Sequence, residues 1–257
     1  MVFRDTAWPE GTPCWVDVMV ADPQRAADFY SALLGWQVED QGEEYGHYAI
    51  AALQGRAAAA VGPKPPGMEM PSVWTTYLAV NDADKTAAKI TEAGGQLVVP
   101  PGDVGESGRM AIAVDPTGAA FGLWQAKQNP GIQIANVPGA VTWNECMTHD
   151  FEGAKAFYAE VFGYRLDDMS GDGFKYATLN VGDSTVGGLG AWPGDVAAEA
   201  PAQWVTYFGV SDTDAAVAKV VDLGGTVTRE PADSPYGRLA QATDNQGVPF
   251  TVISVSE

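Results

Sequence analysis

WVDVMVADPQRAADFYSALLGW, residues 15–36, is the stretch that decides the fold, because the chain contains it twice. It recurs 128 residues later as WNECMTHDFEGAKAFYAEVFGY, residues 143–164. A second pair repeats at a spacing of 130, as WTTYLAVNDADKTAAKITEAGG at 74–95 and WVTYFGVSDTDAAVAKVVDLGG at 204–225. A third repeats at 129, as GRMAIAVDPTGAAFGLW at 108–124 and GRLAQATDNQGVPFTVI at 237–253. The nearly constant spacing indicates two copies of one domain that differ by short loop changes.

Each copy contains two similar parts. In the first part, an apolar run at 16–20 leads to Asp22, a predicted helix N-cap with Pro23 at the first helical position. Apolar side chains at helical spacing give this helix one buried face, and Gly35 predicts its end. Strands are predicted near 36–39, 45–53 and 56–61. The second part repeats this order over 73–125, so the pattern of strand, helix and three strands (βαβββ) occurs four times.

The repeats divide the chain into a first domain at 1–127, a linker at 128–139 (QNPGIQIANVPG) and a second domain at 140–257. The whole chain contains 14 Lys and Arg residues and 33 Asp and Glu residues, so its formal net charge is -19. A charge of this sign repels phosphates and anionic lipid, so nucleic-acid and membrane partners are excluded. The chain has no apolar run of 18 residues and no signal-peptide pattern at its start, so we expect a cytoplasmic protein.

Three motifs carry a resemblance to a known family. FYSALLGW (29–36) and FYAEVFGY (157–164) end the first and third predicted helices, and DPTGAAFGLW (115–124) closes the first copy. With four βαβββ units, the chain resembles the glyoxalase/bleomycin-resistance/extradiol-dioxygenase (vicinal oxygen chelate) superfamily over nearly its whole length. It is most similar there to tandem glyoxalase-like proteins of actinobacteria that carry the label hydroxylase. The resemblance implies an α+β fold in which two units per domain form a curved mixed sheet around a cleft.

The resemblance also implies where a metal ion would be held, namely by a His on the first strand of a unit and a Glu on its last strand. The chain's two histidines, His47 on a predicted strand and His149 before a predicted helix, are too few for a 2-His-1-carboxylate iron site. We therefore predict a cleft without metal or cofactor; a metal held elsewhere, by His47, His149 or Glu43–Glu44, is the alternative. None of the six matching positions carries an imidazole or carboxylate: Trp15, Thr75, Trp143, Val205, Gly122 and Thr251.

The side chains that line the cleft instead follow from strand alternation, because residues two apart share a face. If Trp15 and Trp143 face the cleft, the residues two and four positions further along their strands face it too. A step of two residues from Thr75 and Val205 reaches Tyr77 and Tyr207. The same step from Gly122 reaches Trp124. The predicted ligand-binding residues are Trp15, Met19, Tyr77, Trp124, Trp143, Met147 and Tyr207, and the predicted catalytic carboxylates are Asp17 and Glu145.

A carboxylate between a Trp and a Met loses hydration, so its pKa should rise unless a partner compensates. Three roles for Asp17 and Glu145 stay open: proton transfer beside tyrosine hydroxyls, orientation of a ligand, or a structural role, either capping neighbouring backbone or pairing with an arginine such as Arg109 or Arg238. The difference between an Asp and a Glu at matching places suggests that the two clefts are not equivalent.

The leading functional hypothesis is a pocket that binds a small aromatic or hydrophobic metabolite without a metal, as in the bleomycin-resistance branch of the family. The alternative is a metal-independent enzyme of the lyase, isomerase or hydroxylase type that uses the pocket carboxylates as acid and base. A small molecule is the expected partner. Because one chain already carries four units, we expect a monomer or a weak homodimer.

Overall fold

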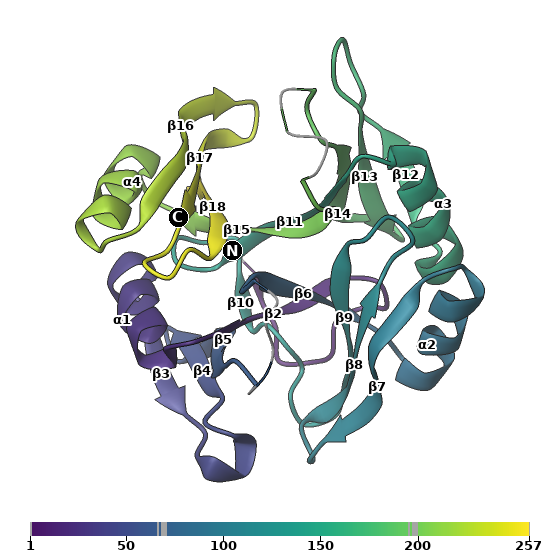
Figure 1. The fold of residues 1–257 in the computed structure, drawn as a ribbon, viewed down its shortest axis with the longest axis horizontal. Helices are drawn as coiled ribbons and strands as arrows, with labels where there is room; N and C mark the ends of the chain where they lie inside the picture. Colours follow the sequence, from purple (N-terminus) through teal and green to yellow (C-terminus); the bar gives the residue numbers. More distant parts are fainter. Residues whose placement is uncertain (1, 66, 68–70, 195, 197–199, 257) are drawn as a thin grey trace.

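The computed structural model describes residues 2–65, 67, 71–194, 196 and 200–256 (Figure 1). Within them, two eight-stranded mixed sheets are formed, one by each half of the chain. The first sheet contains β2 (Pro13–Val20), β3 (Gln37–Asp40), β4 (Ala49–Leu53), β5 (Arg56–Pro63), β6 (Trp74–Ala79), β7 (Gln96–Val104), β8 (Gly108–Val114) and β9 (Ala120–Ala126). The second contains β11 (Val141–Thr148), β12 (Arg165–Asp168), β13 (Tyr176–Val181), β14 (Ser184–Ala191), β15 (Gln203–Val210), β16 (Thr226–Ser234), β17 (Gly237–Thr243) and β18 (Pro249–Ser254).

The strand order confirms the predicted α+β fold of four βαβββ units. It is β3-β4-β5-β2-β6-β9-β8-β7 in the first sheet and β12-β13-β14-β11-β15-β18-β17-β16 in the second. At the centre of each sheet the first strands of two units pair antiparallel, β2 with β6 and β11 with β15. The units therefore join first with second and third with fourth, a pairing that the sequence left open.

Four helices occur among the described residues, α1 (Pro23–Leu34), α2 (Ala83–Glu92), α3 (Phe151–Phe162) and α4 (Thr213–Asp222). An aspartate precedes each helix and accepts a hydrogen bond from the backbone N–H three residues later, as the sequence predicts for Asp22. Gly35 and Gly163 end α1 and α3 in the left-handed conformation, with φ of 77° and 67°. The predicted start and end of α1 are confirmed, because the capping residues Asp22 and Gly35 act locally.

The two halves pack through the faces of the sheets that carry the helices. Helix α1 contacts α4 on one side and α2 contacts α3 on the other, while β6 contacts β15 between them (Figure 1). In the middle, Asn144 Oδ1 accepts hydrogen bonds from the hydroxyls of Thr76 and Thr206. Tyr30 of the first half lies within 6.5 Å, centroid to centroid, of the rings of Phe208 and Phe250 of the second. This packing leaves the opposite face of each sheet available for a cleft.

The predicted linker is an ordered part of the fold. Its residues Ile134–Ala135 form β10, which pairs antiparallel with β1 (Val2–Phe3) at the start of the chain. Ile132, Ile134 and Val137 are buried in the core that the two halves share. The segment between the domains therefore stabilises both of them instead of only connecting them.

One predicted strand begins later than expected, and the placement of His47 on it is wrong. Residues Glu43–Tyr45 form a short 3₁₀ helix, η1, and β4 starts only at Ala49. Gly42, Gly46 and His47 all have positive φ, and His47 Nδ1 lies 2.8 Å from Asp40 Oδ2. The two glycines favour this turn because they adopt left-handed backbone without steric cost.

In the described ranges, no helix is both long and apolar enough to cross a bilayer.

Candidate functional site

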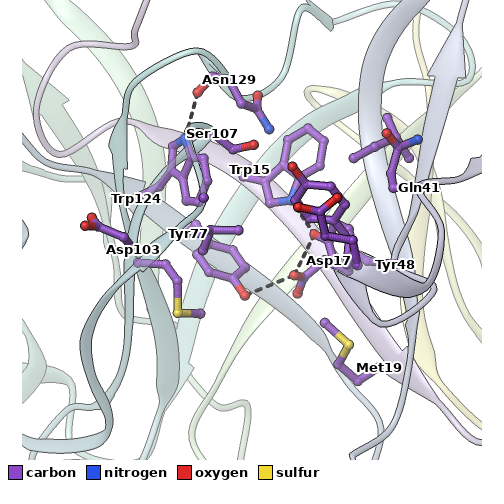
Figure 2. A pocket seen from close by; sticks show the side chains of 16 residues that line it. Trp15, Asp17, Met19, Gln41, Tyr48, Tyr77, Asp103, Ser107, Trp124 and Asn129 are labelled. Carbon is purple, nitrogen blue, oxygen red and sulfur yellow. Dashed lines mark hydrogen bonds between the residues drawn. The ribbon is translucent and has the colours of Figure 1, made fainter.

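A cavity of about 680 Å³ lies on the first sheet (Figure 2), lined by side chains of β2 that alternate along the strand with the buried core residues Val16 and Val18. Strands β2, β6 and β9 form its floor, and its rim comes from the loop around η1 and the turn between β7 and β8. The five residues that strand alternation predicts for the first copy all line it. They are Trp15, Asp17, Met19, Tyr77 and Trp124.

The carboxylate of Asp17 sits at the centre of the floor and is only 3% exposed. Its Oδ2 accepts hydrogen bonds from the hydroxyls of Tyr48 at 2.9 Å and Tyr77 at 3.0 Å. Trp15 Nε1 donates to the Tyr48 oxygen at 2.9 Å, so the Tyr48 hydroxyl must point its proton toward Asp17 (Figure 2). The other oxygen, Oδ1, is buried and makes no hydrogen bond with any residue that the structure describes.

Burial raises the pKa of Asp17 to about 6, because the charged form is poorly solvated. The hydrogen bonds from Tyr48 and Tyr77 lower the pKa but only in part, and the nearby hydroxyl of Thr75, opposite Asp17 on β6, adds the smallest contribution. Burial and the charge of Asp17 raise the pKa values of both tyrosines well above their usual range. The tyrosines therefore stay protonated as donors, while Asp17 is mostly ionised at neutral pH.

The structural pairing with arginine that the sequence left open is wrong. Arg109 Nε donates to Asp84 at 2.8 Å and Arg238 Nε donates to Asp214 at 2.7 Å, both on the outer side of the helices' first turns. Tyrosine hydroxyls take the arginine's place beside Asp17. The carboxylate is thus held by neutral donors, which leave its charge uncompensated.

Glycine at position 122 makes room for one wall of the cavity. A Cβ atom there would lie 2.1 Å from the Tyr77 ring, whose strand pairs with β9 at this point. This is the position at which the resemblance implies a glutamate ligand. The Tyr77 ring therefore fills the space that such a side chain needs.

The second sheet repeats the cluster with one difference. Trp143 Nε1 donates to the Tyr176 oxygen at 3.0 Å, and Tyr176 donates to Glu145 Oε2 at 2.7 Å. Tyr207 donates to Glu145 Oε1 at 2.5 Å. Both oxygens of Glu145 thus have a partner, although burial also raises its pKa. Met147, the remaining predicted residue, lies further along β11 against Gly190.

The rim and floor also differ between the copies. Ser107, on the rim of the first cavity, corresponds to Tyr236 in the second copy, where the side chain is 76% exposed. Gly122 corresponds to Thr251 and Trp124 to Ile253. The aromatic wall is therefore more complete in the first copy.

The residues present do not fit the metal site of the family's metal enzymes. The six implied ligand positions hold Trp, Thr, Val or Gly side chains, none of which supplies an imidazole or carboxylate. Across the described ranges, no group of three or more His, Cys, Asp or Glu side chains is placed to hold a metal ion. The alternative ligands His47, His149 and Glu43–Glu44 do not form such a group. Nε2 of His149 lies 3.1 Å from the carbonyl oxygen of Ala200.

Alternation along strands does not identify the residues that reach the cavity from loops. Tyr48 could have been found, because Tyr176 lies 128 residues later and the repeat marks the pair. Ser107 and Asn129 carry no comparable signal, since they are polar residues in turns. Asn129 accepts the Trp124 indole N–H through its backbone carbonyl at 3.0 Å and so fixes that ring.

Comparison with known proteins places this chain in a family. The model of the Glyoxalase/Bleomycin resistance protein/Dioxygenase superfamily matches residues 14–123 and 140–252. The protein named "Putative glyoxylase CFP32" of Mycobacterium tuberculosis is 42% identical over 97% of both chains. The anthracycline biosynthesis protein DauV of Streptomyces sp. is 36% identical over 98% of this chain and 96% of its own.

Solved structures share the fold at low sequence identity. The 2,2',3-trihydroxybiphenyl 1,2-dioxygenase of Sphingomonas wittichii has a TM-score of 0.65 at 14% identity, over 96% of this chain and 91% of that one. The Mn(II)-bound glyoxalase of Novosphingobium aromaticivorans has a TM-score of 0.64 at 16% identity, over 96% and 83%. With its two matched segments and its four βαβββ units, the chain belongs to the glyoxalase/bleomycin resistance/dioxygenase superfamily.

Proposed function

We propose that the first cleft binds a small aromatic or hydrophobic metabolite without the help of a metal ion. The observation that carries this proposal is Asp17, a carboxylate in the lining of an aromatic-walled cavity whose Oδ1 is buried without a hydrogen bond from the described residues. An unsatisfied buried polar atom costs about 1–3 kcal/mol, and a ligand N–H or O–H would recover that cost. The volume of about 680 Å³ lies within the range of about 300–1,000 Å³ that is usual for small-molecule pockets.

The shape of the wall supports a flat ligand. Trp124 and Tyr77 lie on one side of the cavity and Trp15 and Tyr48 on the other (Figure 2). Because both indole N–H groups donate to protein oxygens, the rings offer their faces to a guest. The anthracycline biosynthesis protein DauV, 36% identical, has a name that points to polycyclic aromatic chemistry, and this supports the same class of ligand here.

Titration with 9-anthracenemethanol, a tricyclic ring with one hydroxyl donor, tests the proposal. We expect saturable binding, followed by anthracene fluorescence, that excess EDTA leaves unchanged. Ser107→Tyr places the second copy's side chain on the rim and should weaken binding about tenfold or more by narrowing the cavity. Tyr236→Ser is the matched control in the other copy and should bind as the wild type does. Equal binding by both variants would place the ligand elsewhere.

A second candidate is a metal-independent enzyme in which Asp17 moves a proton. The raised pKa of Asp17, about 6, favours it because a general base works best when its pKa is near the working pH. The Asp17 carboxylate would take the proton from a carbon next to a carbonyl and return it to the enolate, and Tyr77 would stabilise the enolate oxygen by turning toward it the hydroxyl that it otherwise donates to Asp17.

Hydrogen–deuterium exchange at the CH₂ group of 2-hydroxyacetophenone in D₂O, followed by proton NMR, tests this candidate. The wild type should accelerate exchange, and Asp17→Asn should abolish the acceleration while changing the dissociation constant only about twofold. No acceleration by a wild-type protein that binds the ketone, or a parallel loss of binding and exchange, would leave a binding protein without this activity.

A further inference from the structure

Charge is distributed unevenly over the wall of the first cavity. Three carboxylates line it, those of Asp17, Glu44 and Asp103. Of the described residues that line it, none is a Lys, an Arg or a His. A cavity with one sign of charge and low-dielectric walls concentrates ligands of the opposite sign.

Two of these carboxylates lack a cationic partner within the described chain. Asp103 forms ion pairs with Lys127 at 3.1 Å and Arg109 at 3.4 Å, so its charge is compensated. Glu44, on η1 at the rim, makes no ion pair with any described residue. Among the described residues, Asp17 has only neutral hydroxyls beside it, those of Tyr48 and Tyr77 on Oδ2 and that of the neighbouring Thr75. A buried carboxylate of this kind gains most from a cation, because burial strengthens the attraction.

The aromatic wall accepts a cation as well. The indole N–H groups of Trp15 and Trp124 and the hydroxyl of Tyr48 donate to protein oxygens, so they offer no proton to an anionic guest. These side chains line the cavity with aromatic rings, and the electron-rich face of such a ring attracts ammonium groups. The amide of Asn129 and the hydroxyl of Ser107 are neutral, so they do not reverse this preference.

The second cleft lacks this combination. Both oxygens of Glu145 accept tyrosine hydroxyls, and Arg229 is close enough for its positive charge to act on Tyr207. The residue that corresponds to Arg229 in the first copy is Val99. The chain therefore contains its own comparison, with the same tyrosine–carboxylate cluster but a different charge.

We propose that the first cleft selects aromatic cations, with the rings of the ligand between Trp15 and Trp124 and its ammonium group beside the Asp17 carboxylate. This inference deepens the proposed function and rests on it. Glu44 at the rim attracts the cation before it enters, and Asp17 holds it inside. Neutral aromatics bind more weakly, and aromatic carboxylates bind most weakly of all.

Three probes on one ring test the selection, namely 9-anthracenemethylamine, 9-anthracenemethanol and 9-anthracenecarboxylate, each titrated near neutral pH at low salt. We expect the amine to bind about tenfold more tightly than the alcohol, and the carboxylate more weakly than both. Equal affinity of amine and alcohol, or tightest binding of the carboxylate, would overturn the inference and leave the proposed function standing. If none of the three binds, the proposed function itself fails.

Two variants locate the selecting charge. Asp17→Asn keeps the shape but removes the charge, so the ratio of amine to alcohol affinity should fall to about threefold or less. Glu145→Gln, its counterpart in the second copy, should keep the wild-type ratio. Should Asp17→Asn not fold, Glu44→Gln on the exposed rim provides the same test, because it should slow association of the amine and reduce its salt dependence. An unchanged ratio in Asp17→Asn, or an unchanged association rate in Glu44→Gln, would contradict the assignment.

Discussion

Asp17 and Glu145 occupy the same position in the two copies but distribute their hydrogen bonds differently. Tyr48 and Tyr77 both donate to one oxygen of Asp17, whereas Tyr176 and Tyr207 each take a different oxygen of Glu145. The longer glutamate accepts one tyrosine hydroxyl on each oxygen, whereas the shorter aspartate accepts both on Oδ2 and keeps Oδ1 buried without a tyrosine donor. One methylene group thus distinguishes a closed structural cluster from a cluster that has an acceptor for a ligand.

The raised pKa of Asp17 predicts a pH-dependent cost in stability. Because its folded pKa of about 6 exceeds the unfolded value of 3.8, the folded state binds more protons between these values, and stability falls as pH rises through this window. Replacing the charge by Asp17→Asn should therefore raise the free energy of unfolding above about pH 7 by about 1–3 kcal/mol.

Urea unfolding of the wild type and Asp17→Asn at a series of pH values measures this effect. The stabilisation should shrink as pH falls from about 7 to 4, where wild-type Asp17 becomes protonated. Glu145→Gln serves as the control that exchanges a fully bonded carboxylate. Destabilisation by Asp17→Asn at neutral pH would show that the carboxylate is satisfied in the folded protein.

A substitution at Gly122 tests whether the Tyr77 ring packs directly against the backbone of β9 at this position. Gly122→Ala places a Cβ 2.1 Å from that ring, so Tyr77 must move away from Asp17. We expect a loss of about 1–3 kcal/mol in stability and weaker binding of 9-anthracenemethanol. Gly102→Ala is the control, since its nearest neighbouring atom would be 3.9 Å away. Similar behaviour of the two variants in thermal unfolding would argue against the close contact.

At the scale of elements, local signals determined what the sequence could predict. Asp22, Pro23 and Gly35 define the bounds of α1 because caps act within one turn of the helix. Alternation along β2 predicted Trp15, Asp17 and Met19 on one face, because the strand has no bulge between them.

The loop around η1 could not be predicted in this way. The run of mixed polar and aromatic residues predicts a strand, but glycines on both sides of η1 turn the chain back and place Tyr45 and Tyr48 over the cavity. Ser107 and Asn129 reach the same cavity from turns distant in sequence. Only the folded arrangement of the sheet brings such segments together.

The N-cap of α1 gives a prediction at this scale. Asp22→Ala removes the side-chain acceptor for the Arg25 N–H and should lower the free energy of unfolding by about 1 kcal/mol, without changing ligand affinity. Asp212→Ala removes the corresponding cap of α4 and should have a similar effect. Chemical unfolding combined with a 9-anthracenemethanol titration checks both; a loss of binding would link α1 to the cavity.

At the scale of the whole molecule, the two halves share one core. The Tyr30 hydroxyl accepts the Trp74 indole N–H and donates to Asp244 Oδ2 of the second half. Phe208 of the second half is fully buried against Trp36 and Trp74 of the first. Neither half can unfold without exposing the core side chains of the other.

The shared core predicts one cooperative unfolding transition. Far-UV circular dichroism and tryptophan fluorescence should give the same midpoint. Phe208→Ala should lower the free energy of unfolding by about 3–5 kcal/mol while the two transitions stay coincident. Two separated transitions in the wild type would show that the halves are independently stable.

The most direct test of the central claim is the stoichiometry and position of 9-anthracenemethanol binding, measured by calorimetry on the wild type, Asp17→Asn and Glu145→Gln. A single functional cleft predicts one ligand per chain, with an affinity that falls about fivefold in Asp17→Asn and is unchanged in Glu145→Gln. Two ligands per chain, or equal affinity in Asp17→Asn and the wild type, would contradict the claim that the acceptor in the first cleft holds the ligand.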